Sequence, residues 1–253
     1  IFPSGVVGLS DKDSEDFKMA VNTTVAYAMD AVGYDVLPIA LARLGRKNEL
    51  YDLLQMWPGR HQWFPNGWGQ YGMDYMKADA ALPFRVHPVN EASKAGIGEA
   101  FTFPAFPFRH MGLDSIPVPA CAMNESLLQS YDGIIRVAPA VSESQNARFT
   151  LHAVGGFIVS SEVIEGKPQW IAVKSKVGGL CRLENPWETA YIGNKKCSES
   201  LIEFETDPDQ IYIISPASDT ADNWETTSID YEVNRKPKTS TNVRARLGLP
   251  RMF

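Results

Sequence analysis

The chain has 253 residues, 44% of them hydrophobic and 21% charged, which is enough apolar material for one large domain or two smaller ones. A net charge of −6 and a pI near 5.3 leave no basic face for phosphates and argue against a nucleic-acid-binding protein. No apolar run is long enough to span a bilayer, so we expect no membrane partner. The chain begins at Ile1 and shows no signal peptide, so we expect a processed or truncated product.

The N-terminal part predicts three helices. Apolar residues recur at helical spacing from Phe17 to Val25, after a run of Ser and Asp residues that offers N-caps. A second helix is expected from about Tyr34 to Leu44, with Gly45 as the residue that ends it. A third should run from about Asn48 to Met56 and end at Trp57-Pro58. Helices joined this tightly are typical of a bundle or an α/α toroid.

The segment that follows has a different composition. From Gly59 to Tyr75 it has too many glycines for a helix and too many aromatic residues for a solvent-exposed loop. Phe101 to Phe108 is also aromatic and is interrupted by prolines, and a short helix carrying Glu99 is expected just before it. A long loop in a compact domain is usually functional or disordered, and this one is too aromatic for disorder.

The run from Gly112 to Val137 connects the helical part to a β part. It opens with Asp114 in a turn and continues as an apolar helix from roughly Pro119 to Ser130. Pro119, Met123 and Leu127 are spaced to share one face of that helix. The chain then turns at Asp132-Gly133 and becomes extended.

Beyond Gly133 the hydrophobic period becomes two, with glycine-containing turns between short strands. The expected strands are 149–153, 157–161, 170–174, 180–183, 190–192, 201–205 and 210–214. This spacing predicts an antiparallel sandwich. We therefore expect an α+β protein with a helical region over 1–131, a β-sandwich over 132–216 and a polar C-terminal extension over 217–253.

Cys121, Cys181 and Cys197 lack the spacing of metal ligands, so we expect neither a metal site nor a cofactor. Cys121 is predicted to be a small core residue on the helix that precedes the β part. Cys181 and Cys197 could meet across a hairpin, but free thiols in strands are favoured.

Asp114 is the first candidate for a catalytic group. An isolated acid in a turn is most often an N-cap or a solvated side chain. Asp114, however, lies at the end of the aromatic segment and just before an apolar helix. A carboxylate among apolar groups can have its pKa raised toward the value that a general base needs.

Acids that could act with Asp114 are Glu91, Glu99 and Glu125. Glycoside hydrolysis uses two carboxyl groups on either side of the bond, about 6.5–9.5 Å apart when the configuration inverts. Glu99 is the best placed of the three in the sequence. Glu125 is expected to be a buried or capping acid in its helix.

A set of aromatic, imidazole and guanidinium side chains could bind a sugar, because flat rings stack on sugar faces and N–H groups bond hydroxyls. Its members are His61, Trp63, Trp68, Tyr71, Tyr75, His87, Arg109 and His110. The alternative is an aromatic satellite core beneath a long loop. The two interpretations are about equally favoured, because the dense glycines between Gly67 and Gly72 would be wasteful in a simple packing core.

Two runs, Glu125 to Ala140 and Ala147 to Val159, resemble the end of the catalytic toroid in glycoside hydrolase family 95, which contains α-L-fucosidases and some α-L-galactosidases. Leu37 to Leu54 is similar to a late toroid helix of that family. The resemblance implies the C-terminal helices of an (α/α)6 toroid followed by an antiparallel β-sandwich. It aligns Asp114 with the family's aspartate that activates water as general base.

The chain departs from the family in two respects. Ser115, Ile116 and Pro117 stand where the family has Gly-Asn-Phe after its aspartate. The family's general acid, a glutamate, and its paired asparagines belong to earlier toroid segments, and residues 1–131 are too few for six helical hairpins. An upstream segment or a second chain is therefore expected to complete the toroid.

The leading hypothesis is part of an inverting glycoside hydrolase that cleaves α-linked fucosyl, galactosyl or related sugars from an oligosaccharide or polysaccharide. Such an enzyme would be periplasmic or extracellular. One alternative is a noncatalytic carbohydrate-binding or structural chain that uses Trp63 and Trp68. Another is a toroid-type polysaccharide lyase, with Tyr71 or Tyr75 and His61 or His110 as acid and base.

Overall fold

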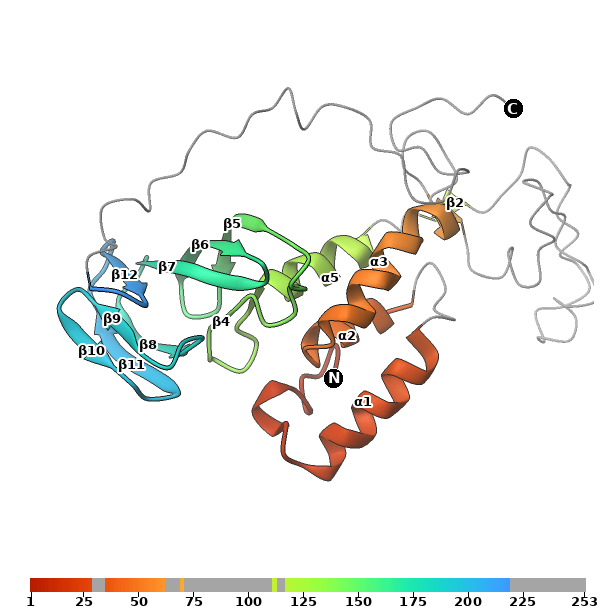
Figure 1. The fold of residues 1–253 in the computed structure, drawn as a ribbon, viewed down its shortest axis with the longest axis horizontal. Coiled ribbons are helices and arrows are strands. Elements are labelled where there is room, and N and C mark those ends of the chain that lie inside the picture. The colour runs from red at the N-terminus through yellow and green to blue at the C-terminus, as the bar shows by residue number, and fades with distance from the viewer. Residues whose placement is uncertain (29–34, 62–68, 71–110, 113–116, 219–253) are drawn as a thin grey trace, which may run out of the picture.

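The computed structural model describes residues 1–28, 35–61, 69–70, 111–112 and 117–218, which form a helical part and a β part (Figure 1). The helices of these ranges are α1 (Glu15–Ala28), α2 (Leu37–Arg43), α3 (Lys47–His61) and α5 (Pro117–Leu127), with a 3-10 turn at Leu9–Asp11. The α+β class is confirmed for this part of the chain. Figure 1 shows α5 between the other helices and the strands.

The central helix of the helical part is α2. Its sequence, Leu-Pro-Ile-Ala-Leu-Ala-Arg, is apolar round nearly its whole circumference, and a helix of that kind is stable only when it is covered on all sides. It contacts α1, α3 and α5, and every residue from Pro38 to Arg43 is buried. The core around it contains Ile39, Leu41, Leu50, Leu53, Trp57, Val118 and Ala122.

The ends of α2 and α3 test the predicted boundaries. Gly45 ends α2 as expected: its φ is +66°, and the Arg46 N–H donates to the Leu41 carbonyl at 2.9 Å. The prediction that Trp57-Pro58 ends the next helix is wrong, since α3 continues to His61. Proline removes one backbone hydrogen bond, but Trp57 is fully buried in the helical core, and its packing favours the helical turn there.

The buried face of α5 also differs from the prediction. Val118 and Ala122, four residues apart, are the buried pair that packs in the helical core. Met123 is 54% exposed, so Pro119, Met123 and Leu127 do not form the buried face. Cys121 is exposed as well, which corrects its assignment to the core. Neighbouring residues on a helix point about 100° apart, so burial of Ala122 turns both of its neighbours outward.

The β part contains two layers. The strands are β3 (Leu128–Gln129), β4 (Arg136–Val137), β5 (Ala147–Ala153), β6 (Phe157–Ile164), β7 (Lys167–Ser175), β8 (Gly179–Glu184), β9 (Ala190–Ile192), β10 (Lys195–Cys197), β11 (Leu201–Thr206) and β12 (Ile211–Ser215). One layer is a six-stranded antiparallel sheet in the order β10-β9-β12-β7-β6-β5. The other contains the pairs β8–β11 and β3–β4, which a bridge from Ile135 to Leu183 connects.

One apolar core is shared by both layers, as in a sandwich. Alternate residues of β6 (Phe157, Val159 and Val163) are buried in it together with Ile171, Leu183, Ile202 and Ile214. All the strands expected from the period of two are present, and Gly166, in the turn after β6, has the positive φ of +71°. The prediction missed β10, whose two lysines and short length gave no apolar alternation. The predicted helix to about Ser130 is also too long, since α5 ends at Leu127 and Leu128–Gln129 form β3.

The cysteines of the sandwich are free thiols, as predicted. Cys181 and Cys197 are both buried, and no disulfide joins them. Burial raises the pKa of the Cys181 thiol to about 12, so this group stays protonated and unreactive at neutral pH.

Replacing Leu183 by Ala should lower the free energy of unfolding by about 2–5 kcal/mol, because the side chain is fully buried between the two layers. The matched control is Leu180→Ala on the same strand, where the side chain is 49% exposed and the expected change is within about 0.5 kcal/mol. Urea unfolding followed by circular dichroism measures both. Equal effects of the two changes would contradict the shared core.

Candidate functional site

A short β ladder joins the aromatic stretch from Gly59 to Tyr75 to the residues just before Asp114. β1 (Gly69–Gln70) and β2 (Met111–Gly112) form an antiparallel ladder in which Gly69 faces Gly112 and Gln70 faces Met111. Paired strands lie about 4.8 Å apart. The chain therefore leaves the helical part and returns to it through two adjacent backbone segments.

The residues predicted to carry chemistry are neighbours of this ladder in the sequence. Trp68 and Tyr71 flank β1, His110 precedes β2, and Asp114 comes two residues after β2 and three before α5. Their side chains, and those of the other predicted site residues, lie outside the described part of the chain: Asp114, Glu99, His61, Trp63, Trp68, Tyr71, Arg109 and His110. The same is true of Glu91, Tyr75 and His87. Their convergence into one site stays a prediction.

Glu125 is the one candidate acid in the described ranges, and it is held in an ion pair. Its Oε1 accepts a hydrogen bond of 2.8 Å from Nη2 of Arg43 at the end of α2. The Arg43 guanidinium also lies against the rings of Phe2 and Tyr131, at 4.9 and 4.3 Å from their centroids. Glu125 is thus a structural acid, in agreement with the expectation from its sequence context.

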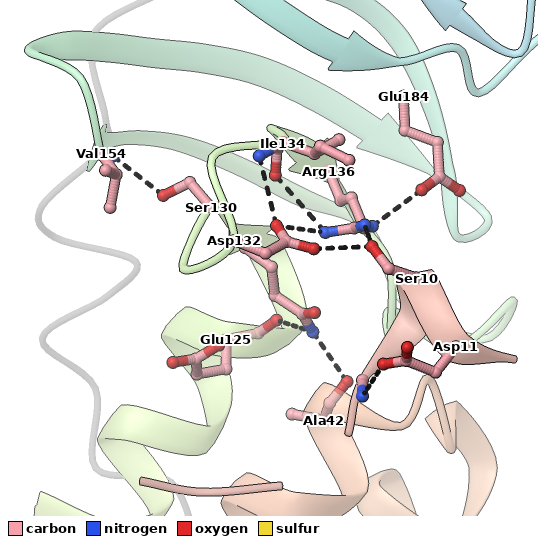
Figure 2. Close-up of polar contacts among 12 residues, drawn as sticks. Ser10, Asp11, Ala42, Glu125, Ser130, Asp132, Ile134, Arg136, Val154 and Glu184 are labelled. Carbon is pink, nitrogen blue, oxygen red and sulfur yellow. Dashed lines mark hydrogen bonds and ion pairs between the residues drawn. The ribbon is translucent and has the colours of Figure 1, made fainter. Parts of the chain in front are cut away.

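Gln129, on β3, ties the helices to the first strand of the sandwich. Its Nε2 donates to the Ala42 carbonyl at 2.8 Å and to the Glu125 carbonyl at 3.0 Å (Figure 2). Ala42 belongs to the last turn of α2, and its carbonyl also accepts from the Gly45 N–H at 3.0 Å. A side chain from the β part therefore adds a second hydrogen bond to the end of the central helix.

Arg136, on β4, holds a second group of charges together. Figure 2 shows its guanidinium between two carboxylates, with Nε bonded to Glu184 at 2.8 Å and Nη1 to Asp132 at 2.9 Å. Nη2 donates to the Ser10 hydroxyl at 2.6 Å, and that hydroxyl donates to Asp132 at 2.7 Å. The Arg136 side chain is only 3% exposed, so these contacts also compensate for its desolvation.

We call the contacts of Arg43, Glu125, Gln129, Asp132 and Arg136 the helix–sandwich junction. Burial alone would raise the pKa of Asp132, but the hydrogen bonds from Arg136 and Ser10 outweigh it and hold that pKa below its usual range. Each carboxylate of the junction accepts from an arginine. Groups paired in this way stabilise structure and are poorly suited to proton transfer.

Sequence analysis did not identify this junction. The sequence does contain a feature that points to the Arg43–Glu125 pair. Arg43 directly follows an apolar run, and Glu125 is the one charged residue of its helix. Opposite charges on two otherwise apolar helices are expected to pair when those helices pack together.

Replacing Arg43 by Met should lower the free energy of unfolding by about 3 kcal/mol, because it leaves the Glu125 carboxylate without its partner. Glu125→Gln is the milder comparison. Its amide oxygen can still accept from Arg43, and the expected loss is about 1 kcal/mol. Chemical unfolding at neutral pH measures both. An Arg43→Met variant as stable as the wild type would contradict the structural role of the pair.

Stability should fall as the solution is acidified through the pKa of Asp132. Because the folded-state pKa is depressed, the contribution of Asp132 is present above its ordinary value of 3.8 and is lost as the pH drops toward the folded value. Asp132→Asn should remove this part of the pH dependence and lower stability at neutral pH. Asp13→Asn, the same change at an exposed site, is the control. Thermal unfolding across that pH range reports the difference, and parallel curves for Asp132→Asn and wild type would contradict the assignment.

Among the described residues, no group of three or more His, Cys, Asp and Glu side chains is arranged to hold a metal ion. No helix in those ranges is both long and apolar enough to cross a membrane. Comparison with protein-family models gives no match, and comparison with curated proteins gives none either.

Proposed function

We propose that the chain is the C-terminal part of an inverting glycoside hydrolase related to family 95, acting on α-linked fucosyl, galactosyl or related sugars. The observation that carries the proposal is the pairing of β1 with β2, next to Asp114 in the sequence. It joins an aromatic stretch whose composition suits a sugar subsite to the residues just before Asp114. The order of helices followed by an antiparallel sandwich is consistent with the family resemblance.

In the proposed reaction Asp114 takes a proton from water as the water attacks the anomeric carbon. The leaving oxygen takes a proton from a carboxylic acid on the other side of the bond. Glu99 is the candidate acid within this chain. The resemblance points instead to a glutamate in an upstream segment. The two possibilities differ in whether Glu99→Gln reduces turnover.

The junction supports the proposed base by holding its helix. Two residues separate Asp114 from the start of α5. α5 is attached to α2 through the Arg43–Glu125 pair and through Gln129, which bonds both helices. A catalytic group next to a rigid element loses less freedom when it adopts its productive position. In this proposal the sandwich stabilises the helical part and performs no chemistry.

The proposed partner is an upstream segment or second chain that completes the toroid. The exposed side of α1 supports this, since it has large apolar side chains such as Tyr27, 62% exposed, and no charge from Met19 to Ala28. Native and denaturing mass spectrometry of the purified protein would reveal a bound second chain. Activity should be assayed on that complete material.

Asp114→Asn should lower the rate of α-L-fucoside or α-galactoside hydrolysis by a factor of about 10²–10⁴, since general-base catalysis contributes about that much. The amide has the same shape as the carboxylate, so circular dichroism should be unchanged. Asp13→Asn, at an exposed position near the N-terminus, is the matched control and should retain full activity.

Full activity in Asp114→Asn would refute the assignment of the base. Absence of turnover in wild-type material that contains every partner chain, with sugar binding retained, would instead favour the noncatalytic carbohydrate-binding alternative. A product with an unsaturated uronic residue would favour the lyase.

A further inference from the structure

A pocket lies between α3, α5 and the chain that leads into β5, and its volume is about 310 Å³. This is at the lower end of the range for small-molecule sites, about 300–1,000 Å³. Its apolar wall includes Leu50 and Leu54 of α3 and Leu127 of α5. The polar side chains of the lining are one phenol, three amides and one hydroxyl: Tyr51, Gln55, Gln145, Asn146 and Ser126. The pocket is lined by described residues of both the helical part and the sandwich.

Among the lining residues that the structure describes, none has a charged side chain. An ion transferred into it would lose hydration without gaining a counter-charge, which is strongly unfavourable. The pocket therefore favours an uncharged ligand. The apolar wall favours a compact ligand with an apolar face.

Two of the three amides of the pocket, Gln145 and Asn146, are oriented by bonds from the backbone. Gln145 accepts from the Ser142 N–H at 3.3 Å through Oε1, and Asn146 accepts from the Glu165 N–H at 2.8 Å through Oδ1. These bonds use the carbonyl ends of the two amides, so their NH₂ ends are the donors for a ligand. Such donors suit neutral oxygen atoms, such as hydroxyl or ring oxygens.

The walls of the pocket are fixed to one another. Ala138 and Ala140 donate backbone hydrogen bonds to the carbonyls of Leu127 and Ser126, at 2.8 and 3.2 Å. Lys47, at the start of α3, pairs with Glu143 at 2.8 Å. The pocket is thus held open by bonds at both helices, which lowers the cost of ordering it when a ligand binds.

We infer that this pocket binds one neutral sugar ring. A pyranose has an apolar face for the leucine wall and hydroxyls for the amides and the Tyr51 phenol. The choice of sugars among neutral ligands rests on the proposed function, while the neutrality and size follow from the lining.

The test uses the methyl group of Met123, a lining residue, as a local reporter. The full chain labelled with ¹³C at the methionine methyls is titrated with L-fucose, D-galactose and D-galacturonate, and Met123→Leu assigns the signal. The two neutral sugars should shift the Met123 signal saturably. Galacturonate, which has the same ring with a carboxylate, should bind at least about tenfold more weakly.

Tyr51→Phe should weaken neutral-sugar binding by about twofold to tenfold, because it removes one hydroxyl from the lining. Tyr27→Phe is the matched control, the same change at an exposed position on α1, and should leave binding unchanged. Both changes are conservative, so folding is preserved. An unresponsive Met123 signal, equal binding of galacturonate, or identical affinity in Tyr51→Phe would each overturn the inference.

The Met123 signal also separates this inference from the proposed function. Asp114→Asn should leave the titration unchanged while it abolishes hydrolysis. A saturable Met123 shift in a protein that never hydrolyses glycosides would refute the hydrolase and retain the pocket. Hydrolysis without any shift of the Met123 signal would refute the sugar-binding pocket and retain the hydrolase.

Discussion

The helical part depends on a positive charge in its interior. The charged Arg43 side chain is buried, and this burial requires a compensating environment. Glu125 supplies the opposite charge, the rings of Phe2 and Tyr131 supply electron-rich faces, and the Ile1 carbonyl accepts a further bond. These partners come from α5, the N-terminal segment and the chain after β3. One side chain thus determines how three separate segments meet around α2.

Arg136 applies the same principle on the sandwich side. Its two carboxylate partners come from the turn after β3 and from β8, and Ser10 brings in the N-terminal segment again. Two buried arginines therefore hold the first residues of the chain against both the helices and the strands. In the sequence, the proposed catalytic base precedes the helix that this arrangement fixes, and the charged junction and the proposed chemistry share no residues.

The sandwich was largely predictable because its physical signals are local. Apolar and polar residues alternate along β5, β6 and β7, and glycine turns separate these strands. Both signals can be read from short stretches of sequence without knowledge of distant contacts. The helical part was harder. α5 buries only small side chains against α2, so its larger residue Met123 suggested the wrong face. The candidate site could be predicted only as a set of residue types in the sequence, because the contacts that orient catalytic groups depend on tertiary packing rather than on spacing.

The direct passage from α5 to β3 has a mechanical consequence. Helix α5 ends at Leu127 and β3 begins at Leu128, so no linker residue lies between the helical part and the sandwich. Rotation of one part against the other would need new backbone dihedrals where α5 meets β3 and the loss of both Gln129 bonds. The two parts are therefore expected to move as a single rigid body. A protease would find no exposed connection at this point at which to separate them, and a pull on the sandwich would be transmitted directly along α5.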